Sequence, residues 1–130
     1  MGVYMNLCVI EGRLARDVEL RFTQSSQAVA NFTVAVNETW VDKQGAKQER
    51  VFWASVVCWG KLGELCKEYL KKGSRCLVQG RLATRQYQGK TGETKYITEI
   101  IAENVKFLDN HAPSKNAEIS SGDQPAYFTE

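Results

Sequence analysis

Residues 61–70 read Lys61-Leu62-Gly63-Glu64-Leu65-Cys66-Lys67-Glu68-Tyr69-Leu70. The apolar residues of this segment fall at positions 62, 65, 66, 69 and 70, which is the i, i+3, i+4, i+7, i+8 spacing of one helix face. Gly73 follows the segment as a helix stop signal. We therefore predict a short helix over this segment, and the residues on both sides of it indicate which fold the helix belongs to.

On both sides of this helix the sequence alternates with a period of two, which is typical of β-strands with one buried face. Residues 51–59 alternate before the helix, and residues 75–87 alternate after it. Residues 28–36 carry the same pattern, and a first strand over about 4–12 and a last strand over about 94–107 complete a set of five. On the three middle strands the even-numbered residues form the aliphatic face, which we expect to be buried: Ala28, Ala30, Phe32, Val34 and Val36; Phe52, Ala54, Val56 and Cys58; Cys76, Val78, Gly80 and Leu82.

Three strands, a short helix and two further strands is the element order of the OB-fold, an all-β, five-stranded and partly open Greek-key barrel. The short helix lies between strands three and four in this interpretation. A plain antiparallel meander is the alternative, but it leaves the helix without a role. We place the OB-fold domain at residues 1–109 and predict a disordered tail over residues 110–130, which hold both prolines and no periodic pattern.

The composition is that of an ordinary globular domain. The 130 residues are 43% hydrophobic and 25% charged, with a formal net charge of +2. No run approaches the roughly 18 apolar residues of a membrane span, and no export signal is visible, so we expect a soluble cytoplasmic protein without a membrane partner. The cysteines form no C-x-x-C pair and lie in apolar stretches, which predicts buried free thiols and no metal site: Cys8, Cys58, Cys66 and Cys76.

The sequence carries no pattern that predicts catalysis. Its single histidine, His111, lies in the tail, and no Gly-x-Ser-x-Gly motif is present. Gly89-Lys90-Thr91 resembles the end of a phosphate-binding loop, but Thr84 stands where that motif needs a glycine. The segment also lies in a predicted turn between two strands, where no helix N-terminus meets a phosphate. We therefore expect no enzyme, no catalytic residue and no cofactor.

Aromatic residues stand beside cations in the second half of the predicted domain. Trp53 and Trp59 are six residues apart on one predicted strand, so they share the face opposite the aliphatic one. The corresponding face of the next strand carries two cations and one ring: Arg81, Arg85 and Tyr87. Between residues 61 and 95, nine cations stand against three carboxylates. In single-stranded nucleic acid the bases stack on aromatic rings, at about 1–3 kcal/mol each, and the phosphates contact cations. The pattern therefore favours single-stranded nucleic acid as the ligand.

Other interpretations of the same residues stay open at this point. A tryptophan in a small β domain is often a core residue, although Trp40 stands beside a polar loop, where a core role is less natural. A basic stretch can be a solvated helix face, as we expect for Lys67. Oligosaccharide binding, another use of the OB-fold, fits the aromatic residues but not the positive charge. A module that only contacts other proteins belongs to a further functional class.

Many short blocks of the sequence follow one another in a familiar order: residues 6–12 with Leu14 and Asp17; 18–22; 28–35; Trp40 with Asp42-Lys43; Trp53; 56–62; 68–74; Gly80-Arg81-Leu82 with Thr84-Arg85; and Tyr96 with Thr98-Glu99. Over about residues 5–108 this order resembles the bacterial single-stranded-DNA-binding protein family. The resemblance implies sequence-independent binding and protection of single-stranded DNA during replication, recombination and repair. The family's stacking aromatics fall on four positions, Trp59 standing where Phe is common and Tyr87 where Trp is common: Trp40, Trp53, Trp59 and Tyr87. Phosphate contacts are then expected from six cations: Lys61, Lys71, Lys72, Arg81, Arg85 and Lys90.

The resemblance also implies a homotetramer and recruitment of other proteins. Ala54 stands where the family often has a histidine that is associated with subunit contacts. The family's acidic C-terminal tip recruits replication and repair enzymes, and this sequence holds a faint echo of that tip at three residues: Asp123, Pro125 and Phe128. A primosomal adaptor or an RNA-binding member of the same superfamily would share the fold and remains the alternative.

Overall fold

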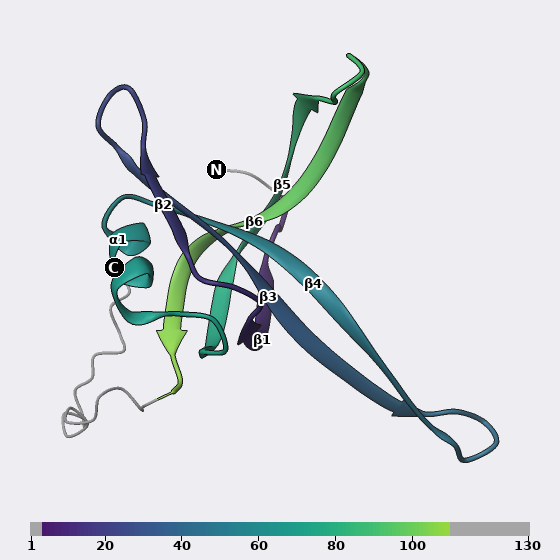
Figure 1. Cartoon of the computed structure of the whole chain (residues 1–130). Helices are drawn as coiled ribbons and strands as arrows, with labels where there is room; N and C mark the ends of the chain where they lie inside the picture. Colours follow the sequence, from purple (N-terminus) through teal and green to yellow (C-terminus); the bar gives the residue numbers. More distant parts are fainter. Residues whose placement is uncertain (1–3, 110–130) are drawn as a thin grey trace.

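The protein is a small β-barrel from which two long hairpins project (Figure 1). This computed structural model describes residues 4–109. Within that range six strands and one helix follow one another: β1 Cys8–Leu14, β2 Glu19–Phe22, β3 Ala28–Val41, β4 Lys47–Trp59, α1 Gly60–Tyr69, β5 Arg75–Gln88 and β6 Thr94–Phe107. The helix predicted over 61–70 is therefore confirmed, displaced by one residue.

The strands form one sheet that closes on itself as an OB-fold barrel. Their order across the sheet is β1-β5-β6-β4-β3-β2, and β1 also pairs with β3. The ring closes at two narrow seams of two residue pairs each, where β4 lies parallel to β6 and β1 lies antiparallel to β3. After β1 ends, β2 continues along β3, so the two short strands are two pieces of the first barrel strand. The predicted five-stranded barrel is thus confirmed, and β2 is the piece that the sequence pattern did not predict.

On the three middle strands, the core is built from even-numbered residues that the alternation predicts. Its buried members on the middle strands are Ala30, Phe32, Val34, Ala54, Val56, Cys58, Cys76 and Val78. Helix α1 packs against β3 and β4 at close range because position 63 is glycine: a Cβ there would lie 2.6 Å from the carbonyl oxygen of Cys58 and 3.3 Å from the Cβ of Ala30. The chain then turns at Gly73, whose φ of +89° favours glycine, in agreement with the predicted stop signal.

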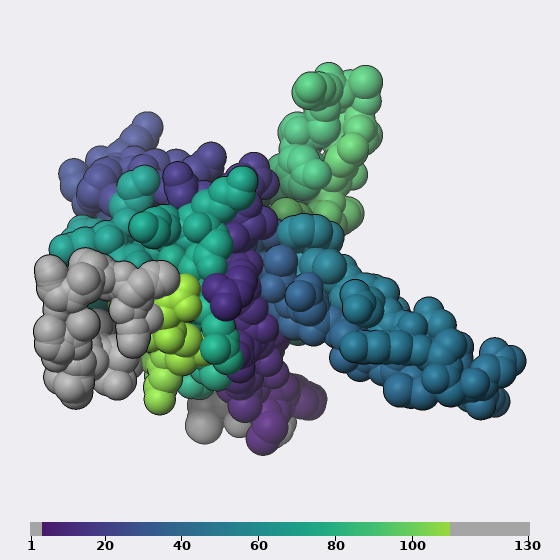
Figure 2. All heavy atoms as spheres, turned by 60° about the horizontal axis from the view of Figure 1, so that its bottom comes forward, coloured from purple at the N-terminus to yellow at the C-terminus, as the bar shows by residue number. Residues whose placement is uncertain are grey.

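Two hairpin arms extend past the barrel wall. Residues 36–52 form the β3–β4 arm and residues 82–98 form the β5–β6 arm, and Figures 1 and 2 show them leaving the barrel on the same side and diverging. The strands of the β5–β6 arm agree with the predicted ranges 75–87 and 94–107. In the β3–β4 arm the predicted strands covered only 28–36 and 51–59, because residues 47–50 are polar or charged on both faces and show no alternation. Phe52 and Leu82 were expected in the buried set, but they are 49% and 47% exposed because they lie on the arms, beyond the core.

Three of the four cysteines are fully buried free thiols, as predicted, whereas Cys8 is half-buried at the start of β1. The Sγ atoms of Cys58 and Cys66 are 3.8 Å apart. The hydrogen bond with Cys58, together with burial, raises the pKa of Cys66, and burial raises the pKa of Cys76 to about 12. These thiols belong to the packed interior.

The predicted tail lies outside the described residues, and with it the three candidate partner-binding residues Asp123, Pro125 and Phe128. The division into a domain over 1–109 and a tail over 110–130 stays a prediction. Within the described part of the chain, α1 is too short to span a membrane.

Candidate nucleic-acid interface

Two tryptophans stand on the outer face of the barrel, the side of the sheet turned away from the core. Trp53 and Trp59 on β4 are 60% and 43% exposed. Their neighbours Ala54 and Cys58 point the other way and are buried. The alternative that these two tryptophans belong to the core is therefore wrong, and their rings are available to a ligand.

The outer face continues from β4 across β6 to β5. Directly paired residues of neighbouring strands point to the same side of a sheet, and one row across four strands consists of Asn31, Val57, Ile101 and Arg81. Arg81 therefore shares the outer face with the two tryptophans. Arg85 and Tyr87 follow at alternate positions of β5, and the Tyr87 ring is 43% exposed. The sequence pattern predicted that each strand would carry such a face, and the sheet joins the two faces into one surface.

Arg85 on this surface is held by a buried carboxylate. Its Nε and Nη2 donate to the two carboxylate oxygens of Glu99 on β6, at 3.0 and 3.1 Å. The Glu99 side chain is only 9% exposed, whereas that of Arg85 is 58% exposed. The hydrogen bonds with Glu99 raise the pKa of Arg85, and the carboxylate offsets much of its positive charge. One edge of the guanidinium is thus fixed, and its other N–H donors remain for a ligand.

Trp40 lies on the β3–β4 arm, on the opposite face from Trp53. It pairs with Gln48, and the even-numbered residues of β4 belong to the core side of the sheet. The guanidinium carbon of Arg50 lies 5.2 Å from the centroid of the Trp40 ring, and Arg50 Nε donates to Glu38 at 2.8 Å. This cation–π contact occupies one face of the indole. Trp40 remains 43% exposed, so its other face is open to stacking.

The arms carry two further exposed rings that the sequence reasoning missed. Phe52 shares the arm face of Trp40, and Tyr96 on β6 is 65% exposed opposite Gln86. The exposure of Phe52 could have been predicted from the charged stretch over 47–50 directly before it, because such a stretch indicates a strand that is solvated on both faces. The exposure of Tyr96 could have been predicted from its place near a cluster of turn residues at 89–92.

The lysines predicted to contact phosphates do not gather at one place, although all are exposed. Lys61 lies in the first turn of α1, close in sequence to Trp59. Lys90 lies at the tip of the β5–β6 arm, in a turn closed by the Gly92 N–H and the Gly89 carbonyl. Lys71 and Lys72 lie in the turn between α1 and β5, where the Lys72 N–H donates to Asp17 at 2.7 Å. These last two positions are outside the rows that form the outer face.

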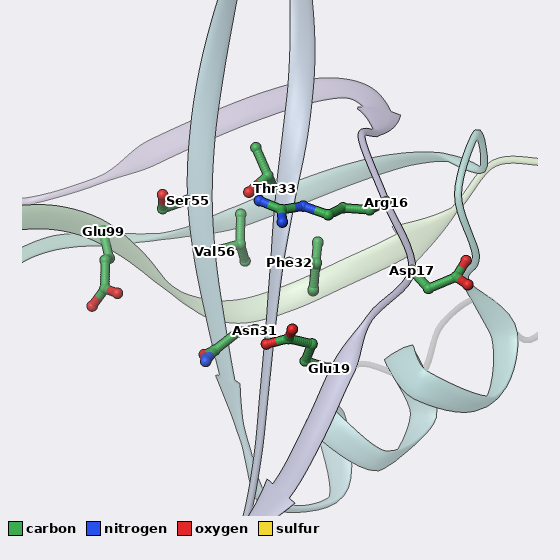
Figure 3. Close-up of a pocket in the computed structure, with 9 residues that line it drawn as sticks. All are labelled: Arg16, Asp17, Glu19, Asn31, Phe32, Thr33, Ser55, Val56 and Glu99. Atoms are coloured by element: carbon green, nitrogen blue, oxygen red, sulfur yellow. The ribbon is translucent and has the colours of Figure 1, made fainter.

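The outer face also holds a hollow of about 150 Å³, which the sequence reasoning did not predict (Figure 3). Thr33 and Ser55 are paired residues of β3 and β4 in its floor, and Asn31 is paired with Glu19 of β2 beside them. Figure 3 shows Arg16 extending across β3 toward Thr33. The sequence feature that points to this hollow is the pair of polar odd-numbered residues on the strand over 28–36, Asn31 and Thr33.

Comparison with known proteins shows which family the chain belongs to. A sequence model described as the single-strand binding protein family matches residues 5–108. The chain belongs to this family. The resemblance drawn from the sequence blocks is therefore confirmed over the same range.

Relatives in the single-strand binding protein family align along most of the chain. It is 40% identical over 127 residues to single-stranded DNA-binding protein 1 of Chlorobaculum tepidum, covering 95% of this chain and 78% of the relative. It is 44% identical over 120 residues to single-stranded DNA-binding protein 3 of Listeria innocua, covering 92% and 74%. Among solved structures, a Plasmodium falciparum single-stranded-DNA-binding protein in complex with single-stranded DNA matches with a TM-score of 0.76 at 30% identity, covering 84% of this chain and 99% of that one. This match supports the OB-fold.

Proposed function

We propose that this chain binds single-stranded DNA with little regard to sequence and protects it during replication, recombination and repair. Membership in the single-strand binding protein family supports the ligand class. The observation that carries the mechanism is the outer face, where the exposed rings of Trp53 and Trp59 stand on the same surface as Arg81 and Arg85. Aromatic platforms suit unpaired bases, whose ring faces are free, and a duplex hides those faces.

The binding residues have two roles: aromatic rings stack on bases, and cations contact phosphates. Four rings stack bases: Trp40, Trp53, Trp59 and Tyr87. Six cations contact phosphates: Lys61, Lys71, Lys72, Arg81, Arg85 and Lys90. Arg81 and Arg85 lie on the outer face, Lys61 follows Trp59 closely in the sequence, and the DNA reaches the others as it passes over the β5–β6 arm and around the barrel. The two arms give a long DNA strand more surface to contact than the barrel wall alone.

We extend the proposal to assembly and cellular place. The chain forms a homotetramer in the cytoplasm, where the basic faces of four copies act together on one DNA strand. Ala54, which the family resemblance links to subunit contacts, is buried in the core of this chain. Contacts between copies then come from other positions. Asp123, Pro125 and Phe128 of the tail recruit replication and repair proteins.

The test is a titration of tryptophan fluorescence with poly(dT) at low and high salt. Strong quenching that weakens at high salt is the expected result, because stacking quenches the indole and released counterions make phosphate contact salt-dependent. A duplex of equal length and an RNA strand of equal sequence are the controls. Equal quenching by duplex contradicts the proposal, and a preference for RNA indicates the alternative superfamily member.

A further inference from the structure

We propose that Arg16, together with the hydroxyl groups of Thr33 and Ser55, forms a phosphate-binding site at the hollow on the outer face. A DNA strand that leaves the exposed tryptophans of β4 passes over this site on its way to the turn between α1 and β5. The inference rests on the proposed binding of single-stranded DNA and adds a contact and a route to it. It is carried by the way in which the chain holds Arg16, by the unpaired groups beside its guanidinium and by the local charge.

The connection between β1 and β2 is fixed on both sides of Arg16. Before it, the N–H of Ala15 donates to the carbonyl of Thr33 on β3 at 2.9 Å. After it, the Asp17 carboxylate accepts from the N–H of Lys72 in the turn between α1 and β5, at 2.7 Å. Arg16 therefore stands at a fixed place between the outer face and the turn that carries Lys72. The lysines of that turn lie outside the rows of the outer face, and Arg16 is the cation that connects them to it.

The guanidinium of Arg16 reaches onto the outer face and is unpaired there. In Figure 3 its side chain extends across β3 and ends beside Thr33. Arg16 is exposed and makes no ion pair or side-chain hydrogen bond with any residue that the structure describes. An arginine head group has five N–H donors in a planar fork that matches phosphate oxygens. These donors are available to a phosphate without breaking a contact inside the fold.

Two hydroxyl groups lie in the floor of the hollow at the level of this guanidinium. Thr33 and Ser55 are paired residues of β3 and β4, and both are half-buried. Their side chains make no hydrogen bond to any residue over 4–109. Threonine and serine hydroxyls are regular donors to phosphate oxygens in DNA complexes. Ser55 stands two residues from Trp53 on the same face of β4, so a phosphate here adjoins a base that stacks on that ring.

The carboxylates around the hollow leave the charge of Arg16 uncompensated. Glu99 already accepts two hydrogen bonds from an arginine of β5, and the Asp17 side chain points away from the hollow in Figure 3. Glu19 forms no ion pair with Arg16, and the β2–β3 register places it two residues along β3 from Thr33. The end of the hollow at Thr33 is therefore its positive end, and a phosphate is the part of a DNA strand that it attracts.

The test measures the binding of poly(dT) by tryptophan fluorescence at several salt concentrations. Arg16→Ala should weaken binding at least about tenfold at low salt, the effect of one hydrogen bond to a charged group. It should also lower the slope of log K against log salt by about 0.7, the value for one phosphate contact. Arg16→Lys keeps the charge and should keep the slope. Thr33→Val removes one hydroxyl at similar size and should weaken binding about threefold with the slope unchanged.

The route is tested by combining Arg16→Ala with Lys72→Ala. Each single variant should lower the slope by about 0.7, and the double variant by about 1.4, because the two side chains contact different phosphates of one strand. A slope that falls in Arg16→Ala but not in Lys72→Ala would overturn the route to the turn.

The matched control is Lys106→Ala. Lys106 is an exposed cation that pairs with Leu77 and stands seven residues along β6 from Glu99, away from the hollow, and its substitution changes the net charge equally. It should leave the slope unchanged. An unchanged slope in Arg16→Ala, or an equal fall in Lys106→Ala, would overturn the inference. Failure of the wild-type chain to bind poly(dT) would overturn the proposed function itself, which separates the two results.

Discussion

Arg85 and Glu99 form a two-point ion pair in which the carboxylate is buried and the guanidinium is half exposed. The pair joins β5 to β6 at the start of the β5–β6 arm. Arg81 shares the outer face but has no ion-pair partner within residues 4–109. Two arginines on one surface therefore carry different effective charges toward a phosphate.

This difference predicts unequal salt dependence in the two alanine variants. Arg81→Ala should lower the slope of log K against log salt for single-stranded DNA by about 0.7, the value for one lost phosphate contact. Arg85→Ala should lower the slope less, because Glu99 already offsets its charge. Arg85→Ala should also reduce the free energy of unfolding by about 1–2 kcal/mol, a value discounted for the exposure of the guanidinium, since it leaves a buried carboxylate unpaired.

Salt titrations and urea unfolding of both variants measure this prediction. The double variant Arg85→Ala/Glu99→Gln is the control, because removing the orphaned charge should restore part of the lost stability. Identical slopes together with unchanged unfolding free energies would show that the ion pair is unimportant in solution.

Trp53→Ala should weaken binding of single-stranded DNA by about 1–3 kcal/mol with little change in the salt slope. The reason is that the 60% exposed ring of Trp53 supplies a stacking face and no charge. Trp53→Phe keeps a ring and should retain most of the affinity. Equilibrium titrations at several salt concentrations check this, and a slope that changes as much as in Arg81→Ala would contradict the division between stacking and phosphate contact.

The period-two pattern was sufficient to predict the barrel strands because a buried face imposes it. The same reasoning missed the outer part of the β3–β4 arm, since residues 47–50 are solvated on both sides and nothing forces them to alternate, whereas the strands of the β5–β6 arm were predicted over 75–87 and about 94–107. Phe52 was assigned to the core by its even number, but only the pairing of β3 with β4 shows that it lies past the barrel. Glu99 could not be matched to Arg85 without the register between β5 and β6. Sequence patterns thus predict the two faces of an individual β-strand, whereas contacts between residues on different β-strands can be found only from the fold.

The cysteines should differ sharply in reactivity toward a thiol reagent. In the native protein only Cys8, which is half-buried, should react quickly, because burial keeps the others from the reagent. The hydrogen bond with Cys58, together with burial, also raises the pKa of Cys66, and burial raises that of Cys76. All four should react in denaturant. Mass spectrometry of the alkylated protein counts the modified sites, with Cys8→Ser as the control that removes the fast one. Rapid native labelling of Cys58 would show that the α1 end of the barrel opens readily.

The turn at the tip of the β3–β4 arm should depend on pH through Asp42. Its Oδ1 accepts from the N–H groups of Gln44 and Ala46, both at 2.9 Å, and its Oδ2 accepts from the Gln48 side chain. These bonds, that from the Ala46 N–H first, lower the pKa of Asp42 below its ordinary value of 3.8. Because the folded pKa is the lower one, the stabilisation is complete above that ordinary value and disappears as pH falls through the folded pKa.

Hydrogen exchange at the tip of this arm measures the effect. In Asp42→Ala the amides of Gln44 and Ala46 should exchange faster at neutral pH, while global unfolding by urea stays unchanged because the turn is exposed and far from the core. Asp42→Asn keeps an acceptor oxygen, so it should protect both amides and remove their pH dependence in the acidic range. Unaltered exchange in Asp42→Ala would mean that the cross-strand pairs of the arm hold the turn without the carboxylate.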